Sequence, residues 1–304
     1  MNRAESVYIQ VMTTFHIGSY SVHRVGFGAM QLPGPGVFGP PRDHDQAIAV
    51  LKRAVELGVD HIDTSQFYGP DVSNELIHEA LHPYPANLAL VSKVGARRDD
   101  TGAWLPAQQP DELRQGIEDN LRTLEVDRLA AVNLRIHGGD DPNTPSDVDR
   151  ELFDRQLTAM IAARDEGLIA GIGLSGIGPD HLRIALDRTE IVTVQNAYNL
   201  LDRTSQPVLD SCLEHGISFV PFFPLGSGFI ADNPVLGNAV VQQAAADLGH
   251  KPAQLVLAWT LSVAPNVLLI PGTSSVAHLE ENLAVADIEL PAALVDELNA
   301  LTPA

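Results

Sequence analysis

IAVLKRAVELGVDHIDT, residues 48–64, joins two hydrophobic patterns at a single glycine. Ile48, Leu51 and Val55 share one face of a helix, Gly58 follows them, and a short apolar run then begins. Glycine permits the left-handed conformation that often ends a helix, and a continuous apolar run suits a strand that is buried on both faces. The stretch therefore predicts a helix that leads into a buried parallel strand.

The same arrangement recurs at 153–175 and at 208–223, where Gly167 and Gly216 separate the helical pattern from the apolar run. Alternating strands and helices form a parallel sheet. Eight such units without a break favour a closed (β/α)8 TIM barrel, of the α/β class, over an open doubly wound sheet. We expect its strands at 25–29, 61–64, 88–94, 129–136, 170–174, 192–196, 217–223 and 267–271.

A short segment precedes the first unit. Residues 15–17 and 20–22 flank a turn at Gly18-Ser19, and this pattern predicts a β-hairpin that could plug the bottom of the barrel. Because no linker or low-complexity tract divides the sequence, we expect residues 1–304 to form a single domain.

The composition excludes several classes of function. Lys and Arg number 19 against 39 Asp and Glu, a net charge of −20, and so acidic a surface argues against nucleic-acid and membrane-surface roles. The most apolar region, 255–270, is interrupted by Ser262, Pro265 and Asn266, so we expect no spanning segment. The lone cysteine, Cys212, is expected in the core and fits a cytoplasmic protein. We expect a monomer or a simple homo-oligomer that acts on a small molecule.

Three polar residues fall where strands of the expected barrel end, which is where such barrels carry their chemistry. Asp63 ends the second strand, Tyr68 follows in the loop, and Lys93 ends the third strand. A tyrosine, with an ordinary pKa of about 10, is a poor acid at neutral pH. A nearby ammonium stabilises tyrosinate, and a carboxylate keeps that ammonium oriented. The three could donate a proton to a developing alkoxide; alternatively, Asp63 and Lys93 form only a structural ion pair.

A second group of residues indicates a dinucleotide site. The segment 268–282, LLIPGTSSVAHLEEN, runs from the eighth strand into a helix, where Thr273, Ser274 and Ser275 and the free N–H groups would favour an anion. The same hydroxyls are also ordinary helix caps. Because no G-x-G-x-x-G follows the first strand, a dinucleotide would lie in the barrel mouth and not on a Rossmann sheet.

His78-Glu79-Ala80-Leu81-His82 matches the zinc-protease pattern H-E-x-x-H. We expect it at the C-terminal end of a helix, which points to the bottom of the barrel and away from the catalytic loops. A solvated helix flank is therefore the preferred interpretation, and we expect no metal site.

At these residues the sequence resembles the aldo-keto reductases over nearly the whole chain, and it looks closest to a bacterial branch that contains pyridoxal reductases. The resemblance implies reduction of an aldehyde or ketone, such as pyridoxal, with NADPH as the cofactor and NADH as the alternative. Tyr68 would donate the proton, Lys93 would make it more acidic, and Asp63 would pair with Lys93. The resemblance is carried by GFGAM (26–30), GVDHIDTSQFYG (58–69), LVSKVG (90–95), GIGLSG (171–176), VQNAYN (194–199), PFFPLGSG (221–228) and IPGTSSVAHLEEN (270–282).

The cofactor residues that the resemblance implies are spread around the mouth. They are Gly28, Ala29 and Met30 after the first strand, Ser175 and Gln195 at the carboxamide, Phe222 against the nicotinamide, Leu225 and Ser227 along the pyrophosphate, and Thr273, His278, Glu281 and Asn282 at the adenosine end.

The sequence departs from the family pattern at three places. The fourth catalytic position, normally histidine, is Arg135 in an ungapped register, or His137 if the strand runs longer. A guanidinium can polarise a carbonyl or bind an anionic group but cannot act as a titrating acid. Gly176 replaces a residue that binds the carboxamide, and His278 replaces a basic residue at the 2′-phosphate, which leaves the choice between NADPH and NADH open.

Arg135 would suit a pyridoxal-like substrate, whose phenolic oxygen is anionic. Trp104 and His137 are expected to line the substrate pocket, although Trp104 could equally be a hydrophobic anchor. Two other functions stay open: a Schiff-base aldolase that uses Lys93, and a nicotinamide-binding regulatory subunit with little catalysis.

Overall fold

A curled sheet in which all strands are parallel forms the centre of the molecule. The structure is a computed structural model, and it describes residues 14–136, 147–226 and 232–302. Seven strands follow the order β11-β10-β9-β8-β5-β4-β3, and every neighbouring pair is parallel. The strands are β3 (Phe27–Gly28), β4 (His61–Asp63), β5 (Ala89–Val94), β8 (Ala131–Arg135), β9 (Ile172–Ser175), β10 (Thr193–Ala197) and β11 (Ser218–Phe222).

The eighth expected strand closes the sheet through isolated bridges. Val267 pairs with Phe219, and Leu269 pairs with Val25 on the other side, both in parallel. The N–H of Leu268 donates to the oxygen of Phe219 at 2.9 Å. The strand was expected to reach residue 271, but its bridges end at Leu269. Pro271 has no N–H with which to continue the pairing. The barrel itself is confirmed.

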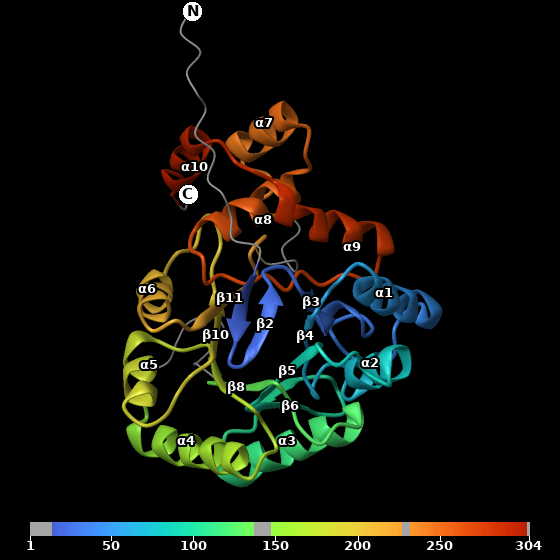
Figure 1. The fold of residues 1–304 in the computed structure, drawn as a ribbon, viewed down its shortest axis with the longest axis vertical. Coiled ribbons are helices and arrows are strands. Elements are labelled where there is room, and N and C mark those ends of the chain that lie inside the picture. Colours follow the sequence, from blue (N-terminus) through green and yellow to red (C-terminus); the bar gives the residue numbers. More distant parts are fainter. Residues whose placement is uncertain (1–13, 137–146, 227–231, 303–304) are drawn as a thin grey trace, which may run out of the picture.

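Helices surround this sheet, and Figure 1 shows them as a ring around the strands. Their buried faces pack on the sheet because their apolar residues recur at helical spacing; in α1 these are Ala47, Val50, Leu51 and Ala54. α7 and α10 pack outside the ring, against α8. The helices are α1 (His44–Glu56), α2 (Val72–Leu81), α3 (Pro110–Leu124), α4 (Arg150–Asp165), α5 (Pro179–Leu186), α6 (Gln206–Glu214), α7 (Ala239–Leu248), α8 (Pro252–Ser262), α9 (Val276–Leu283) and α10 (Ala292–Asn299), with 3-10 turns at Ala29–Gln31 and Ala284–Asp287.

The predicted N-terminal hairpin is confirmed. β1 (Thr14–Ile17) and β2 (Tyr20–His23) pair antiparallel. Ile17 and Val22 are buried in one cluster with residues near the starts of the strands, which places the hairpin over the bottom of the barrel. That cluster also holds Ala89, Val91, Ala130, Ala131, Val192, Val220 and Leu268.

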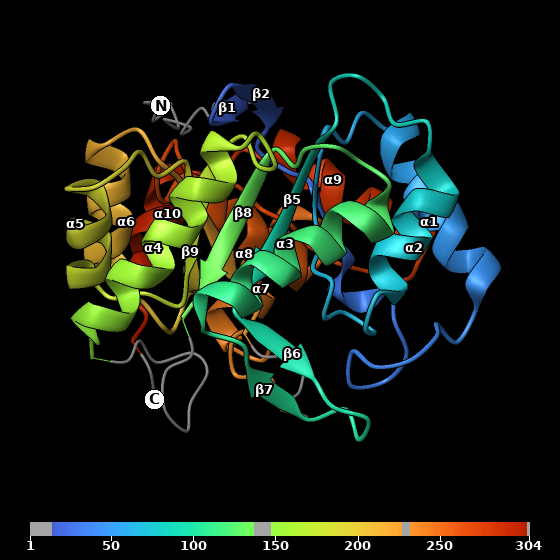
Figure 2. The ribbon, with the colours of Figure 1, turned by 90° about the horizontal axis from the view of Figure 1, so that it is seen from below.

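A second hairpin, which the sequence did not predict, lies at the opposite end of the barrel (Figure 2). β6 (Ala96–Arg98) and β7 (Trp104–Pro106) pair antiparallel, so Trp104 lies in a strand and not in an irregular loop. Its turn is held by the Asp99 carboxylate, which accepts from the N–H groups of Thr101 and Ala103 at 2.9 Å each. None of the helices in the described ranges is both long and apolar enough to cross a membrane.

Candidate active site

The carboxyl ends of the strands meet at one end of the barrel, which we call the mouth. There the register pairs Asp63 with Gly28, Lys93 with Asn133, and Arg135 with Ser175. In a parallel barrel, side chains at this end converge on a common space. The candidate residues from separate strands are therefore brought to one end of the molecule.

Lys93 is buried at the centre of this group. Its Nζ donates to Oδ1 of Asp63 and, at 3.1 Å, to the backbone oxygen of Thr64. It lies 5.0 Å from the ring centroid of Tyr68, and Asp63 and Tyr68 are buried as well. Burial alone would lower the pKa of Lys93, but the Asp63 carboxylate and the Tyr68 phenol outweigh burial and raise it. The lysine is thus held as an ammonium.

Asp63 is also held from across the mouth. Its Oδ2 accepts from Nε2 of Gln195, on β10, at 2.6 Å. One of the two N–H groups of the Gln195 amide is therefore used by Asp63. The expected contact of Gln195 with a nicotinamide carboxamide would use its amide oxygen or its second N–H group.

Arg135, the last residue of β8, links three strands at the mouth. Its Nη1 donates to Oγ of Ser175 on β9 at 3.1 Å, and its guanidinium carbon lies 5.2 Å from the ring centroid of Phe222 on β11. Burial lowers the pKa of Arg135, and the Tyr68 charge opposes that effect. This electrostatic effect indicates that Arg135 and Tyr68 lie in the same part of the mouth. Arg135 at the fourth catalytic position stays a prediction, because the alternative, His137, lies outside the described residues.

A buried polar network supports the ends of β4 and β5, and sequence reasoning missed it. Thr64 donates to Oδ1 of Asn74 at 2.8 Å, and Nδ2 of Asn74 donates to Oδ1 of Asn120 at 2.9 Å. Ser92, which precedes Lys93, donates to the same Asn120 oxygen at 2.6 Å. The only sequence signal was two asparagines on apolar helix faces, at Asn74 in α2 and Asn120 in α3.

Trp104 reaches this site through one aromatic neighbour. Its ring centroid lies 5.6 Å from that of Phe67, at an interplanar angle of 77°, and the Phe67 ring lies 5.4 Å from that of Tyr68, at 89°. Such edge-to-face contacts are favourable. Trp104 is 41% exposed, so the wall that it forms faces solvent on one side.

The residues expected at the cofactor lie around the same mouth. Ser275 accepts from the N–H of His278 at 3.4 Å and caps α9, and Thr273 accepts from the N–H of Ser275 at 3.0 Å in the turn before the helix. A Cβ at Gly272 would come within 2.6 Å of the Gly28 oxygen, so this loop runs directly against β3. Ala29 and Met30 follow β3, and Leu225 follows β11. Glu281 and Asn282 lie on α9, where the Glu281 carboxylate forms an ion pair with Lys251. Ser227 lies outside the described residues.

The H-E-x-x-H stretch lies at the C-terminal end of α2, as predicted. The His78 and His82 rings are 4.8 Å apart, and His78 lies 3.3 Å from the Glu125 carboxylate. No cluster of His, Cys, Asp and Glu in the described ranges has a metal-binding arrangement.

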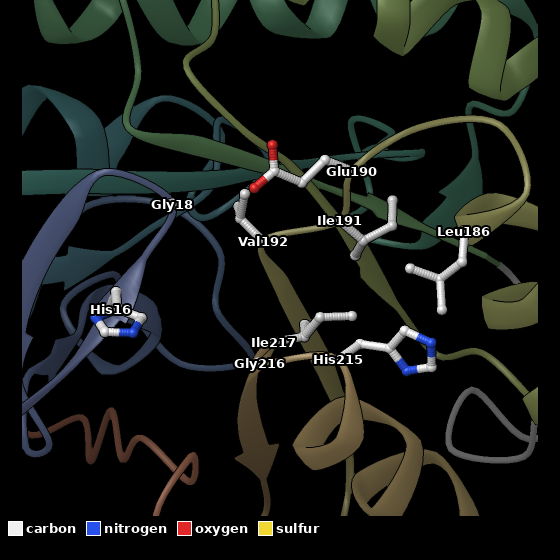
Figure 3. Close-up of a pocket in the computed structure, with 9 residues that line it drawn as sticks. All are labelled: His16, Gly18, Leu186, Glu190, Ile191, Val192, His215, Gly216 and Ile217. Carbon is white, nitrogen blue, oxygen red and sulfur yellow. The ribbon is translucent and has the colours of Figure 1, made fainter.

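A cavity of about 220 Å³ lies at the other end of the molecule (Figure 3). The starts of β10 and β11 and the β1–β2 hairpin line it, and its two histidines, His16 and His215, lie on opposite sides. Because its polar groups diverge, and because barrels of this kind carry chemistry at the other end, the cavity is separate from the candidate active site. Its lining is His16, Gly18, Leu186, Glu190, Ile191, Val192, His215, Gly216 and Ile217.

Comparisons with known proteins agree with this geometry. Residues 24–303 match the model of the Aldo/keto reductase family. The chain belongs to the aldo/keto reductase family. It is therefore an oxidoreductase of carbonyl compounds and alcohols, built on the barrel that the sequence predicted.

Several known proteins resemble the chain over most of its length. It is 47% identical to pyridoxine 4-dehydrogenase of Escherichia coli, over 95% of this chain and 98% of that protein. It is 38% identical to an uncharacterized oxidoreductase of Schizosaccharomyces pombe, over 94% and 89%. An aldo-keto reductase of Klebsiella pneumoniae, solved in complex with NADPH, superposes with a TM-score of 0.76 at 25% identity, over 95% and 94%.

Proposed function

We propose that this aldo/keto reductase interconverts pyridoxal and pyridoxine with NADPH as the reductant. The cluster of Asp63, Lys93 and Tyr68 at the mouth carries the proposal, because it joins a buried ammonium to a phenol. The similarity to pyridoxine 4-dehydrogenase supports the substrate, and the NADPH complex of the Klebsiella reductase supports the cofactor.

The side chains at the mouth fit a nicotinamide dinucleotide. Phe222 offers an aromatic face, and the Ser175 hydroxyl and the Gln195 amide oxygen can bind a carboxamide. The N-terminus of α9, which is capped by Ser275, offers first-turn N–H groups to a phosphate. When bound, the nicotinamide supplies hydride to the carbonyl carbon.

The residues of this chain manage the proton and the developing charge. Tyr68 donates its proton to the carbonyl oxygen as the C=O bond becomes a C–O single bond. The Lys93 ammonium stabilises the phenolate that remains, and Asp63 holds Lys93 in place. In the reverse direction, the phenolate accepts the proton of the alcohol.

We propose that Arg135 binds the phenolic oxygen that lies next to the aldehyde in pyridoxal. Its guanidinium is at the mouth, close enough to Tyr68 to interact electrostatically with it, and is held by the neutral Ser175 hydroxyl. A guanidinium binds an anionic oxygen strongly when water is largely excluded. This would orient the aldehyde toward Tyr68.

The raised pKa of Lys93 favours the reductase over a Schiff-base aldolase. Attack on a carbonyl requires a neutral amine, whereas the Asp63 carboxylate and the Tyr68 phenol keep this lysine protonated. Substrate trapping on Lys93 by borohydride, without nicotinamide, would reverse this preference.

The test of the proposal is NADPH consumption, followed by absorbance, across aldehydes that include pyridoxal. We expect pyridoxal to have a kcat/KM above that of aliphatic aldehydes, and pyridoxine to be the product. NADPH binding with negligible turnover of every aldehyde would instead support a regulatory subunit.

A further inference from the structure

Arg98, in β6 at the rim of the mouth, is enclosed between two aromatic rings. Its guanidinium carbon lies 4.1 Å from the ring centroid of Trp104 and 5.3 Å from that of Phe38. Both distances are within the range of cation–π attraction, which is stronger where the cation is partly desolvated. Burial lowers the pKa of Arg98, with Asp99 opposing it, in agreement with that enclosure.

The same guanidinium joins two segments that are distant in sequence. It donates to the backbone oxygens of Gly36 and Val37 at 3.0 and 2.8 Å. It also donates to that of Gly102, in the β6–β7 turn, from Nη2 at 2.6 Å. A single side chain therefore fastens the loop 34–39 to the β6–β7 hairpin.

The loop 34–39 is in turn bound to the segment that carries Tyr68. The N–H of Gly39 donates to the oxygen of Gly69 at 2.8 Å, and the N–H of Gly69 donates to the oxygen of Val37 at 3.2 Å. The contacts thus run from Tyr68 through the loop to Arg98 and Trp104. They return from Trp104 to Tyr68 through the Phe67 ring.

We propose that Arg98 is a positioning residue that sets the preference of the enzyme for aromatic aldehydes. It does so by holding Trp104 against Phe67, so that a flat apolar wall stands beside Tyr68. The inference rests on the proposed carbonyl reduction at Tyr68. A planar substrate needs the wall for binding, whereas a short aliphatic aldehyde does not, and the chemical step itself needs only the groups around Lys93.

The test compares Arg98→Met with Arg97→Met, its exposed neighbour in the same short strand. For pyridoxal, we expect R98M to raise KM about tenfold, which corresponds to the loss of one partly buried cation–π contact. We expect kcat for pyridoxal to change less than about twofold. For propionaldehyde, we expect both constants to change less than about twofold in R98M, and R97M to resemble the wild type for both aldehydes. Arg98→Lys should recover part of the loss, because lysine keeps the charge but not the fork of donors.

Two measurements separate positioning from a general loss of structure. Trp259 is buried, so greater acrylamide quenching of fluorescence in R98M would report a released Trp104. In a Trp104→Leu background, R98M should have no further effect on KM for pyridoxal, because the residue through which it acts is gone.

Equal losses with both aldehydes, additive effects of R98M and W104L, or unchanged quenching would each overturn the proposal for Arg98. Failure of the wild-type enzyme to reduce any aldehyde would instead overturn the proposed function. The quenching measurement would still test whether Arg98 holds Trp104.

Discussion

Lys93 is a buried cation, and its partners keep it charged where burial alone would favour the neutral amine. Asp63 and Tyr68 raise its pKa above the ordinary value, so the ammonium persists through neutral pH. An ammonium 5.0 Å from the centre of a phenol ring stabilises the phenolate form of that phenol. The proposed proton donor therefore depends on these residues as a group.

The first prediction concerns the phenol itself. Tyr68→Phe removes the proposed proton donor but leaves the ring that packs at 5.4 Å on Phe67. We expect kcat for pyridoxal to fall at least about a hundredfold, since a positioned acid contributes about that much or more. NADPH affinity, measured by fluorescence titration, should stay within about threefold of the wild type. A variant that kept a tenth of wild-type turnover would remove Tyr68 from its role.

The second prediction separates Arg135 from that proton donor. Pyridoxal and its 3-O-methyl ether differ at the oxygen that Arg135 is proposed to bind. Arg135→Met should lower kcat/KM for pyridoxal about a hundredfold and that for the ether by less than about threefold, because only the first presents an anionic oxygen. Steady-state kinetics with the two substrates would measure this. Equal losses would mean that Arg135 acts on the carbonyl and not on the phenolic oxygen.

At the scale of elements, one buried arginine fastens α8 to the closing run of the barrel. The Nη2 of Arg24 donates to the backbone oxygens of Leu261 and Ala264 at 2.6 Å each, and its Nε donates to that of Val267 at 2.9 Å. Burial lowers the pKa of Arg24 to about 10, which still leaves it charged at neutral pH. Arg24 thus caps α8 with a charged donor for the carbonyl group of Leu261 in its last turn, and it also binds two carbonyl groups that follow the helix.

The third prediction follows from these three acceptors. Arg24→Met would leave buried carbonyl groups without their donor and should lower the free energy of unfolding by about 3 kcal/mol or more. Arg42→Met, at an exposed position before α1, should change it by less than about 0.5 kcal/mol. Urea unfolding followed by circular dichroism would measure both. Similar losses of unfolding free energy in the two variants would contradict the proposed capping of α8 by Arg24.

The fourth prediction concerns the start of α5, which a histidine caps. The N–H of Gly178 donates to Nδ1 of His181 at 3.4 Å, so this ring must be neutral. Burial lowers the pKa of His181 below its ordinary 6.5, although Asp180 opposes this. The unfolded chain therefore takes up a proton first as the pH falls. Stability should decline from about pH 6.5 downward through the lower pKa of the folded state.

Urea unfolding at pH 7.5 and 5.5 would measure this decline. His181→Gln should make the difference between the two pH values smaller, because glutamine does not titrate. His16→Gln, at an exposed position in β1, should leave the difference as in the wild type. A difference that is the same in H181Q and in the wild type would assign the pH dependence to other groups.

At the scale of the whole molecule, the sequence predicted the elements whose signals are local. The periodicity around Gly58 and Gly167 predicted helices followed by buried strands, and Gly18 marked the hairpin turn. The β6–β7 hairpin was missed, because its strands are short and Arg98 holds it by contacts with the remote loop 34–39. Structure that depends on such contacts has no local signal.

In the candidate site, too, residues with a local sequence signal were predicted, and contacts between remote segments were missed. Asp63 and Lys93 could be placed at the mouth because each ends a strand, and parallel strands end together. The bond from Gln195 to Asp63 joins residues 132 positions apart, and its geometry exists only after the barrel has closed. The network of Asn74 and Asn120 likewise depends on how two helices pack on the sheet, which periodicity alone does not specify.

The β1–β2 hairpin and the candidate active site at the mouth lie at opposite ends of the barrel (Figure 2). The last prediction uses this separation. Val22 is fully buried in the plug, so Val22→Ala should lower the free energy of unfolding by about 2 kcal/mol through lost burial and a residual cavity.

At 25 °C, however, kcat/KM for pyridoxal should stay within about twofold in V22A. The buried cluster that holds Val22 does not include Asp63, Lys93 or Arg135, and distant sites are energetically nearly independent. Ser21→Ala, the exposed neighbour in β2, should change neither quantity. Thermal unfolding and steady-state kinetics on the same preparations provide the measurement. If V22A lowered activity in proportion to stability, the plug would have to be coupled to the mouth, because the wall of strands would then transmit a displacement from one end of the barrel to the other.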